Sequence, residues 1–188
     1  MDFGYHIHRC WCRLCRIGHS RGFGIQSPFA YQMVTDVLCQ TNPYYLYDDL
    51  KSLFPQLRGL QLCICKMLLR LSNAQQSAET YFDDGLPKEY MAYVKAGNRK
   101  GQFLPTPDDK CRFFLFTTEN KETVVRVLDS AHDGTIVFLD RIYGNEDAIE
   151  LWEQVKKHPR VSATFDLFDC GIAVLNRSVQ KMNYTMNL

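Results

Sequence analysis

Residues 111–116, CRFFLF, and residues 135–139, TIVFL, decide the fold of this chain. Each is a continuous apolar run, which is typical of a strand buried on both faces of a parallel sheet. Residues 120–131 lie between them and repeat apolar side chains at helical spacing. A strand, a helix and a second strand in this order predict a right-handed crossover connection, and therefore an α/β fold.

The pattern continues toward the C-terminus. Asn145 is placed to cap a helix over residues 146–157, and acidic residues in its first turn suit the positive end of that helix. Residues 161–165 and 170–175 predict two strands joined by a short turn, which is an antiparallel pair. The expected sheet is therefore mostly parallel and finishes in an antiparallel hairpin.

The first 75 residues predict only helices. Ser27 is placed to cap a helix with Pro28 in its first turn, and this helix is expected to continue to Gln40. The other segments expected before residue 111 are helices at 5–17, 47–54, 61–73 and 88–96, and strands at 79–85 and 102–104. The chain therefore divides into a helical extension, residues 1–75, and a shortened Rossmann-like domain, residues 76–188, and the two form one compact unit.

The interval before the first apolar run is short. Only 25 residues separate Gly85 from Cys111, whereas a whole β-α-β unit takes about 30 residues or more. At least one strand–helix unit is therefore expected to be missing from this three-layer Rossmann-like sandwich.

Three segments resemble a known protein family. RGFGIQSPFAYQMVTDVL (residues 21–38), followed by PYYLYDDL (residues 43–50), resembles the opening of methyltransferase-like proteins from Bacteroides-type bacteria. LWEQVKKHPRVSATFDLFDCGIAV (residues 151–174) is similar to their closing segment. A β-α-β-α series that closes with a β-hairpin is also how class I S-adenosylmethionine-dependent methyltransferases end. The resemblance implies a class I methyltransferase-like fold.

The resemblance also implies S-adenosylmethionine as the cofactor. The first strand of such enzymes corresponds here to ETYFDDGLP (residues 79–87), so that Asp83, Asp84 and Gly85 become the expected cofactor-binding residues. The family has a glycine-rich turn at this place, because a Cβ would collide with a cofactor that packs against the backbone. Only Gly85 remains of that turn, and the cofactor loop is therefore expected to be degenerate.

On the acceptor side, the resemblance points to the end of the run TIVFL. Asp140 and Tyr143 are expected to face an acceptor at the carboxyl edge of the sheet. Metal-dependent O-methyltransferases place carboxylates after the two apolar strands, whereas Thr117 stands after the first strand here. A divalent metal site with one carboxylate is not expected, and no catalytic residue is assigned.

Two functions follow from these departures. The first is a non-catalytic binding or structural module on a degenerate methyltransferase fold, in which case a homo-oligomer is expected because a shortened sheet leaves an edge to cover. The alternative is an active S-adenosylmethionine-dependent methyltransferase acting on a small hydroxyl or amine. Methyl transfer from a sulfonium depends mainly on positioning, so the lack of an acid–base motif does not exclude the alternative.

Composition limits the classes of partner and the cellular compartment that we expect for this protein. The formal net charge is +1, which provides no global field to attract nucleic acid. The sequence has no apolar run of about 18 residues, the length of a membrane span, and no apolar signal-peptide core. We therefore expect a cytoplasmic protein that binds no membrane and whose eight cysteines are thiols.

Three local clusters each allow two interpretations. The first is a helical face of His8, Cys12, Cys15 and His19, which we interpret as an amphipathic face with buried thiols and alternatively as part of a zinc site. The second is a basic face of Arg9, Arg13, Arg16 and Arg21, which is solvated by default and alternatively contacts RNA or phosphate. The third is the group of Tyr44, Tyr45 and Tyr47, which packs the helices on the sheet or lines an acceptor pocket.

Overall fold

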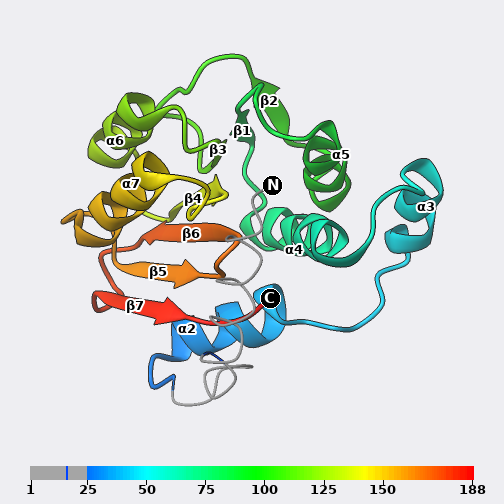
Figure 1. Cartoon of the computed structure of the whole chain (residues 1–188), viewed down its shortest axis with the longest axis horizontal. Coiled ribbons are helices and arrows are strands. Elements are labelled where there is room, and N and C mark those ends of the chain that lie inside the picture. Colours follow the sequence, from blue (N-terminus) through cyan, green and yellow to red (C-terminus); the bar gives the residue numbers. More distant parts are fainter. Residues whose placement is uncertain (1–15, 17–24) are drawn as a thin grey trace.

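The computed structural model describes Arg16 and residues 25–188 (Figure 1). Its centre is a seven-stranded sheet with the strand order β2-β1-β3-β4-β6-β5-β7. β6 runs antiparallel to both of its neighbours, and every other pair of neighbouring strands is parallel. The strands are β1 (Glu79–Phe82), β2 (Gln102–Leu104), β3 (Phe113–Phe116), β4 (Thr135–Asp140), β5 (Ala163–Asp166), β6 (Cys170–Leu175) and β7 (Met182–Thr185). This is the mostly parallel Rossmann-like sheet that the sequence predicts.

Helices cover both faces of the sheet. Figure 1 shows α4 and α5 on one side and α6 and α7 on the other. The helical elements are α2 (Pro28–Gln32), the π-helix η2 (Met33–Leu38), α3 (Leu46–Leu53), α4 (Gly59–Gln75), α5 (Lys88–Gly97), α6 (Lys121–Ser130) and α7 (Glu146–Lys157). The result is the expected sandwich of three layers.

Alternation along the buried strands divides the core in two. Phe113 and Leu115 of β3 pack into the apolar cluster under the N-terminal helices, while Phe114 and Phe116 pack under α6 and α7. Successive side chains of a strand point to opposite faces, so a run that is apolar at every position serves both layers. This confirms the interpretation of CRFFLF as a strand buried on both faces.

The predicted helix caps are confirmed. Ser27 Oγ accepts a hydrogen bond from the backbone N–H of Ala30, and Asn145 Oδ1 accepts one from that of Ala148. The predicted helix over residues 28–40 is wrong in type, because it becomes a π-helix at Met33, where the N–H of Cys39 donates to the carbonyl of Val34. π-Helices are rare, and apolar spacing does not distinguish them from α-helices.

The sheet has one strand more than expected. β7 pairs in parallel with β5, so the predicted hairpin of β5 and β6 is not the last element. The side chains of β7 are mostly exposed, and a strand without a buried face leaves no apolar pattern to recognise.

The short interval before β3 has a visible consequence. β2 and β3 both pair in parallel with β1, on its two sides, and the chain passes from Leu104 to Phe113 without a helix. The interval therefore holds one helix, α5, and one three-residue edge strand, as its length allows.

The tyrosine group is divided between two environments. Tyr47 is buried and its ring lies 5.4 Å from that of Tyr44, centroid to centroid, whereas Tyr45 is 78% exposed. The packing interpretation thus fits Tyr47 and fails for Tyr45.

None of the helices within residues 25–188 combines the length and the apolar character needed to cross a membrane.

Candidate functional site at the carboxyl edge of the sheet

Four parallel strands end at one edge of the sheet. β1, β3, β4 and β5 run in the same direction, so the residues at or directly after their C-terminal ends share one edge. Three of these residues are buried aspartates, namely Asp83, Asp140 and Asp166. Ligands of open α/β sheets bind at this edge, which makes the three carboxylates the candidate site.

Asp83 is fully engaged within the chain. Its Oδ1 accepts a hydrogen bond from the N–H of Gly85, and its Oδ2 accepts from the N–H and the hydroxyl of Thr117 and from the side-chain amide of Asn120. Burial alone would raise the pKa of Asp83, but these hydrogen bonds outweigh it and hold the pKa below its ordinary value. The carboxylate therefore joins the turn after β1 to the end of β3.

Gly85 packs against the same neighbour. A Cβ at Gly85 would lie 2.9 Å from the Cγ2 methyl of Thr117, closer than carbon atoms approach without one of them moving. The chain itself thus accounts for a small residue here, without the cofactor that the sequence suggested. Asp84 and Gly85 are exposed and Asp83 is buried, so the three predicted cofactor residues lie together in one turn but differ in access.

Asp140, the last residue of β4, is a buried carboxyl with an altered pKa. Its pKa is raised to about 6, mainly by burial; the charge of Arg141 and a hydrogen bond from Tyr90 oppose the shift, and the nearby charge of Asp169 adds to it. The Tyr90 hydroxyl lies 3.4 Å from Asp140 Oδ1. A carboxyl of this kind exchanges a proton near neutral pH, as a general acid or base must.

Two thiols belong to the same buried region. Burial raises the pKa of Cys65 to about 12 and that of Cys170 well above its ordinary value, and Asp140 contributes to both shifts. Thiols of this kind stay protonated and unreactive near neutral pH. They line the region as small apolar groups and supply no nucleophile.

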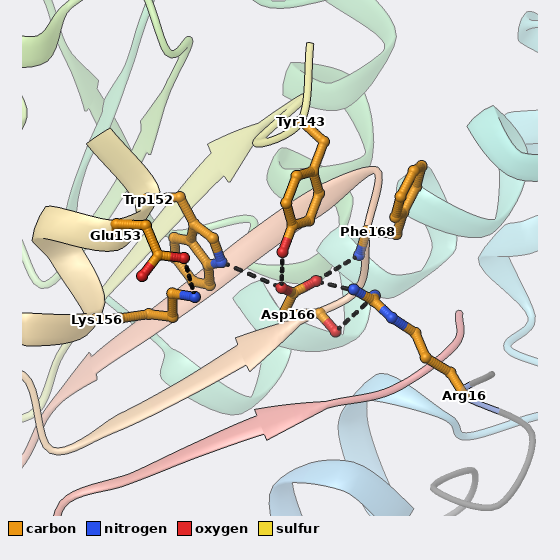
Figure 2. Close-up of polar contacts among 7 residues, drawn as sticks. All are labelled: Arg16, Tyr143, Trp152, Glu153, Lys156, Asp166 and Phe168. Carbon is orange, nitrogen blue, oxygen red and sulfur yellow. Dashed lines mark hydrogen bonds and ion pairs between the residues drawn. The ribbon is translucent and has the colours of Figure 1, made fainter. Parts of the chain in front are cut away.

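Tyr143 contacts Asp166, an aspartate that the sequence analysis did not select. Its hydroxyl donates to Asp166 Oδ2 over 2.6 Å, and its ring stacks on that of Phe168 with 5.1 Å between centroids (Figure 2). Burial and this hydrogen bond raise the pKa of Tyr143. The predicted acceptor-side residues Asp140 and Tyr143 therefore have different partners. Tyr143 is hydrogen-bonded to Asp166, whereas Asp140 is hydrogen-bonded to Tyr90.

Asp166 collects further donors from three parts of the chain. Its carboxylate accepts from the indole N–H of Trp152 on α7, from the N–H of Phe168 and from the guanidinium of Arg16 (Figure 2). Arg16 was expected on a solvated basic face, and for this residue the expectation is wrong, because its side chain is 11% exposed and ion-paired. The other three arginines and the face formed by His8, Cys12, Cys15 and His19 lie outside the described residues, so neither interpretation of that face is tested.

Sequence reasoning missed Asp166, Asn120 and Tyr90 for different reasons. Asn120 and Thr117 follow an apolar strand, so their position at the carboxyl edge was a usable signal. Tyr90 and Asp140 are 50 positions apart, and Arg16 and Asp166 are 150 apart. No local pattern relates residues at such separations.

Two surface pockets lie away from this edge. One is open and lies on the outer face of α6. The other has a volume of about 300 Å³ and lies at the opposite edge, where β5 begins and β6 ends. Two of its cations are already engaged, since Arg160 donates to backbone carbonyls at the C-terminal end of α6 and Lys181 to the carbonyl of His158. Neither pocket is lined by Asp83, Asp140 or Asp166.

Within the part of the chain that the structure describes, no three His, Cys, Asp or Glu side chains gather closely enough to hold a metal ion. Searches against protein-family models, curated proteins and solved structures returned no match to this chain.

Proposed function

We propose that this chain is a non-catalytic binding module built on a class I methyltransferase-like fold. The observation that carries the proposal is the saturation of Asp83, whose two carboxylate oxygens accept four hydrogen bonds from Gly85, Thr117 and Asn120. A carboxylate in this state has little capacity left for the amino group of a cofactor. The turn after the first strand is thus fastened to β3.

The fold resemblance supports the methyltransferase origin. The parallel strands β1, β3 and β4 are followed by a hairpin whose second strand, β6, inserts between β4 and β5. This agrees with the closing hairpin on which the resemblance partly rests. Fold alone carries no activity, and the function is therefore argued from the site.

The alternative is an active S-adenosylmethionine-dependent methyltransferase acting on a small hydroxyl or amine. One observation favours it: Asp140, with its pKa of about 6, lies at the ligand-binding edge and could take a proton from such an acceptor. Asp84, exposed in the turn after β1, would then be the carboxylate available to the cofactor.

Calorimetric titration of the full chain with S-adenosylmethionine and S-adenosylhomocysteine separates the two functions. A binding module is expected to give no heat with either compound up to millimolar concentration. The titration is run at two temperatures, because a binding enthalpy can vanish at one of them, and a thermal unfolding curve confirms that the sample is folded. Micromolar binding that Asp84→Asn weakens would contradict the module and favour the enzyme.

The remaining parts of the proposal concern the setting of the protein. We place it in the cytoplasm as a homo-oligomer with no nucleic-acid partner. β2, a strand of only three residues, and the mostly exposed β7 are the two edges of the sheet, and an uncovered edge favours pairing with another chain. Light scattering tests this part, and a monomer at all accessible concentrations would contradict it.

A further inference from the structure

We propose that Asp166 and Phe168 form a binding seat for the guanidinium group of an arginine side chain, filled in this structure by Arg16 and able to accept an arginine of another protein segment. The inference names a ligand class for the proposed binding module, and to that extent it rests on the proposed function. This guanidinium seat consists of Asp166 and Phe168, which contact the cation, and of Tyr143 and Trp152, which hold them.

The guanidinium of Arg16 is held by three features of the seat. Its Nη1 lies 2.9 Å from Asp166 Oδ1 and 3.5 Å from the backbone carbonyl of Asp166, and its Cζ lies 5.4 Å from the centre of the Phe168 ring (Figure 2). A carboxylate, a carbonyl and an aromatic face together suit a planar, delocalised cation with several N–H donors. A compact ammonium ion does not stack on a ring in this way.

The seat is organised by residues other than Arg16. Tyr143 and Trp152 donate to Asp166 Oδ2 over 2.6 and 3.3 Å, and the N–H of Phe168 donates to Oδ1 over 3.0 Å. The Phe168 ring is in turn stacked on Tyr143. The orientation of both the carboxylate and the aromatic face is therefore fixed before a cation arrives, which reduces the entropy lost on binding.

The charge of the seat requires a cation. The three fixed donors of Asp166 are neutral groups, and the side chain of Asp166 is 5% exposed. A buried carboxylate without a counter-ion is costly. Because Arg16 is 150 positions away in sequence, it reaches the seat much as an arginine from a separate peptide would.

The position of the seat favours a ligand rather than a purely internal contact. Asp166 ends β5 at the carboxyl edge of the sheet, where ligands of such folds bind. Arg16 belongs to the same chain as the seat and therefore competes at a high effective concentration. An external arginine binds only to those molecules in which the side chain of Arg16 has moved out of the seat.

The test follows Trp152, which touches Asp166 directly. The chain has two tryptophans, Trp11 and Trp152, so Trp11→Phe leaves the indole of Trp152 as the single reporter in a ¹H–¹⁵N spectrum of the full chain. In this background we compare Arg16, Arg16→Gln and Arg16→Lys. The probes are ethylguanidinium and arginine amide, with ethylammonium and urea as controls.

In Arg16→Gln, millimolar ethylguanidinium and arginine amide are expected to shift the Trp152 indole signal saturably. Ethylammonium is expected to bind about tenfold more weakly or less, and urea to leave the signal unchanged. With Arg16 present, the apparent affinity for both guanidinium probes should fall about tenfold or more. Asp166→Asn added to Arg16→Gln should abolish the saturable shift.

A shift that is linear in concentration, equal for ethylammonium, or retained in the Asp166→Asn double variant would overturn the seat. If Arg16→Gln does not fold, the same titration of Arg16→Lys decides the question, since lysine keeps a cation near Asp166 without stacking as a guanidinium does. The readout involves no S-adenosylmethionine, so failure of the seat and failure of the proposed function are separately visible.

Discussion

The pKa of Asp140 sets a pH dependence at the scale of a single residue. The folded protein holds the carboxyl proton more tightly than the unfolded chain, with a pKa of about 6 against 3.8. This carboxyl therefore costs nothing below pH 3.8, and its cost to folding grows as the pH rises to about 6 and is constant above that. The full cost is on the order of 3 kcal/mol.

We expect Asp140→Asn to remove this cost, since an amide keeps a partner for the Tyr90 hydroxyl without ionising. Urea unfolding between pH 4 and 7.5 should show the wild type losing free energy of unfolding relative to the variant up to pH 6, and a constant difference above it. Asp84→Asn, at the exposed end of the β1 turn, is the matched control. Parallel curves for wild type and Asp140→Asn would contradict the assignment.

Other single residues show where sequence reasoning stops. The sequence placed Asp83, Asp84, Gly85 and Asp140 at strand ends, and they lie there. It did not show that the carboxylate of Asp83 would accept hydrogen bonds from Thr117 and Asn120, because the order of the strands in the sheet decides which side chains meet. Local sequence patterns carry no information about which strands are neighbours in the sheet.

At the scale of elements, Arg70 of α4 joins this helix to the π-helix η2 and to α3. Its guanidinium is buried and donates to the carbonyls of Val37 and Leu38 at the end of the π-helix and to the hydroxyl of Tyr47 in α3. These bonds satisfy carbonyls at a helix end, which otherwise lack partners. The wide turn of η2 and the position of α3 thus depend on one side chain.

Arg70→Lys is expected to lower the free energy of unfolding by about 1–3 kcal/mol, because one ammonium does not reach all three acceptors. Hydrogen exchange should accelerate over residues 28–53 while β3 and β4 stay protected. Tyr47→Phe removes only one of the three bonds and should have the smaller effect. Uniform acceleration over the whole chain would show that Arg70 does not act locally.

Elements were predicted well where burial imposes a period and poorly elsewhere. β3 and β4, buried at every position, and α7 with its cap on Asn145 follow the pattern closely. β7 exposes most of its side chains, and η2 differs from an α-helix only in its backbone bonding. Both lack a signal in side-chain spacing, which is the information that a sequence pattern carries.

At the scale of the whole molecule, one apolar cluster joins the helical extension to the sheet. It contains Ala30 of α2 and Leu68 of α4 together with Phe113 of β3 and Phe138 of β4. The boundary near residue 75 divides the sequence by pattern, but the core crosses it. We therefore expect the extension and the Rossmann-like part to unfold together.

Urea unfolding of the Trp11→Phe chain should give coincident transitions by far-ultraviolet circular dichroism and by Trp152 fluorescence, as a two-state process requires. A fragment of residues 76–188 should fail to fold, because α5 alone would remain on one face of its sheet and the apolar surface that α4 and the other N-terminal helices cover would meet water. A fragment of residues 25–188 is the control; it keeps both core clusters and is expected to fold, less stably, because Asp166 loses Arg16. Two separate transitions, or a folded 76–188 fragment, would make the helical extension an independent unit, and the shared cluster would then be an interface between two domains.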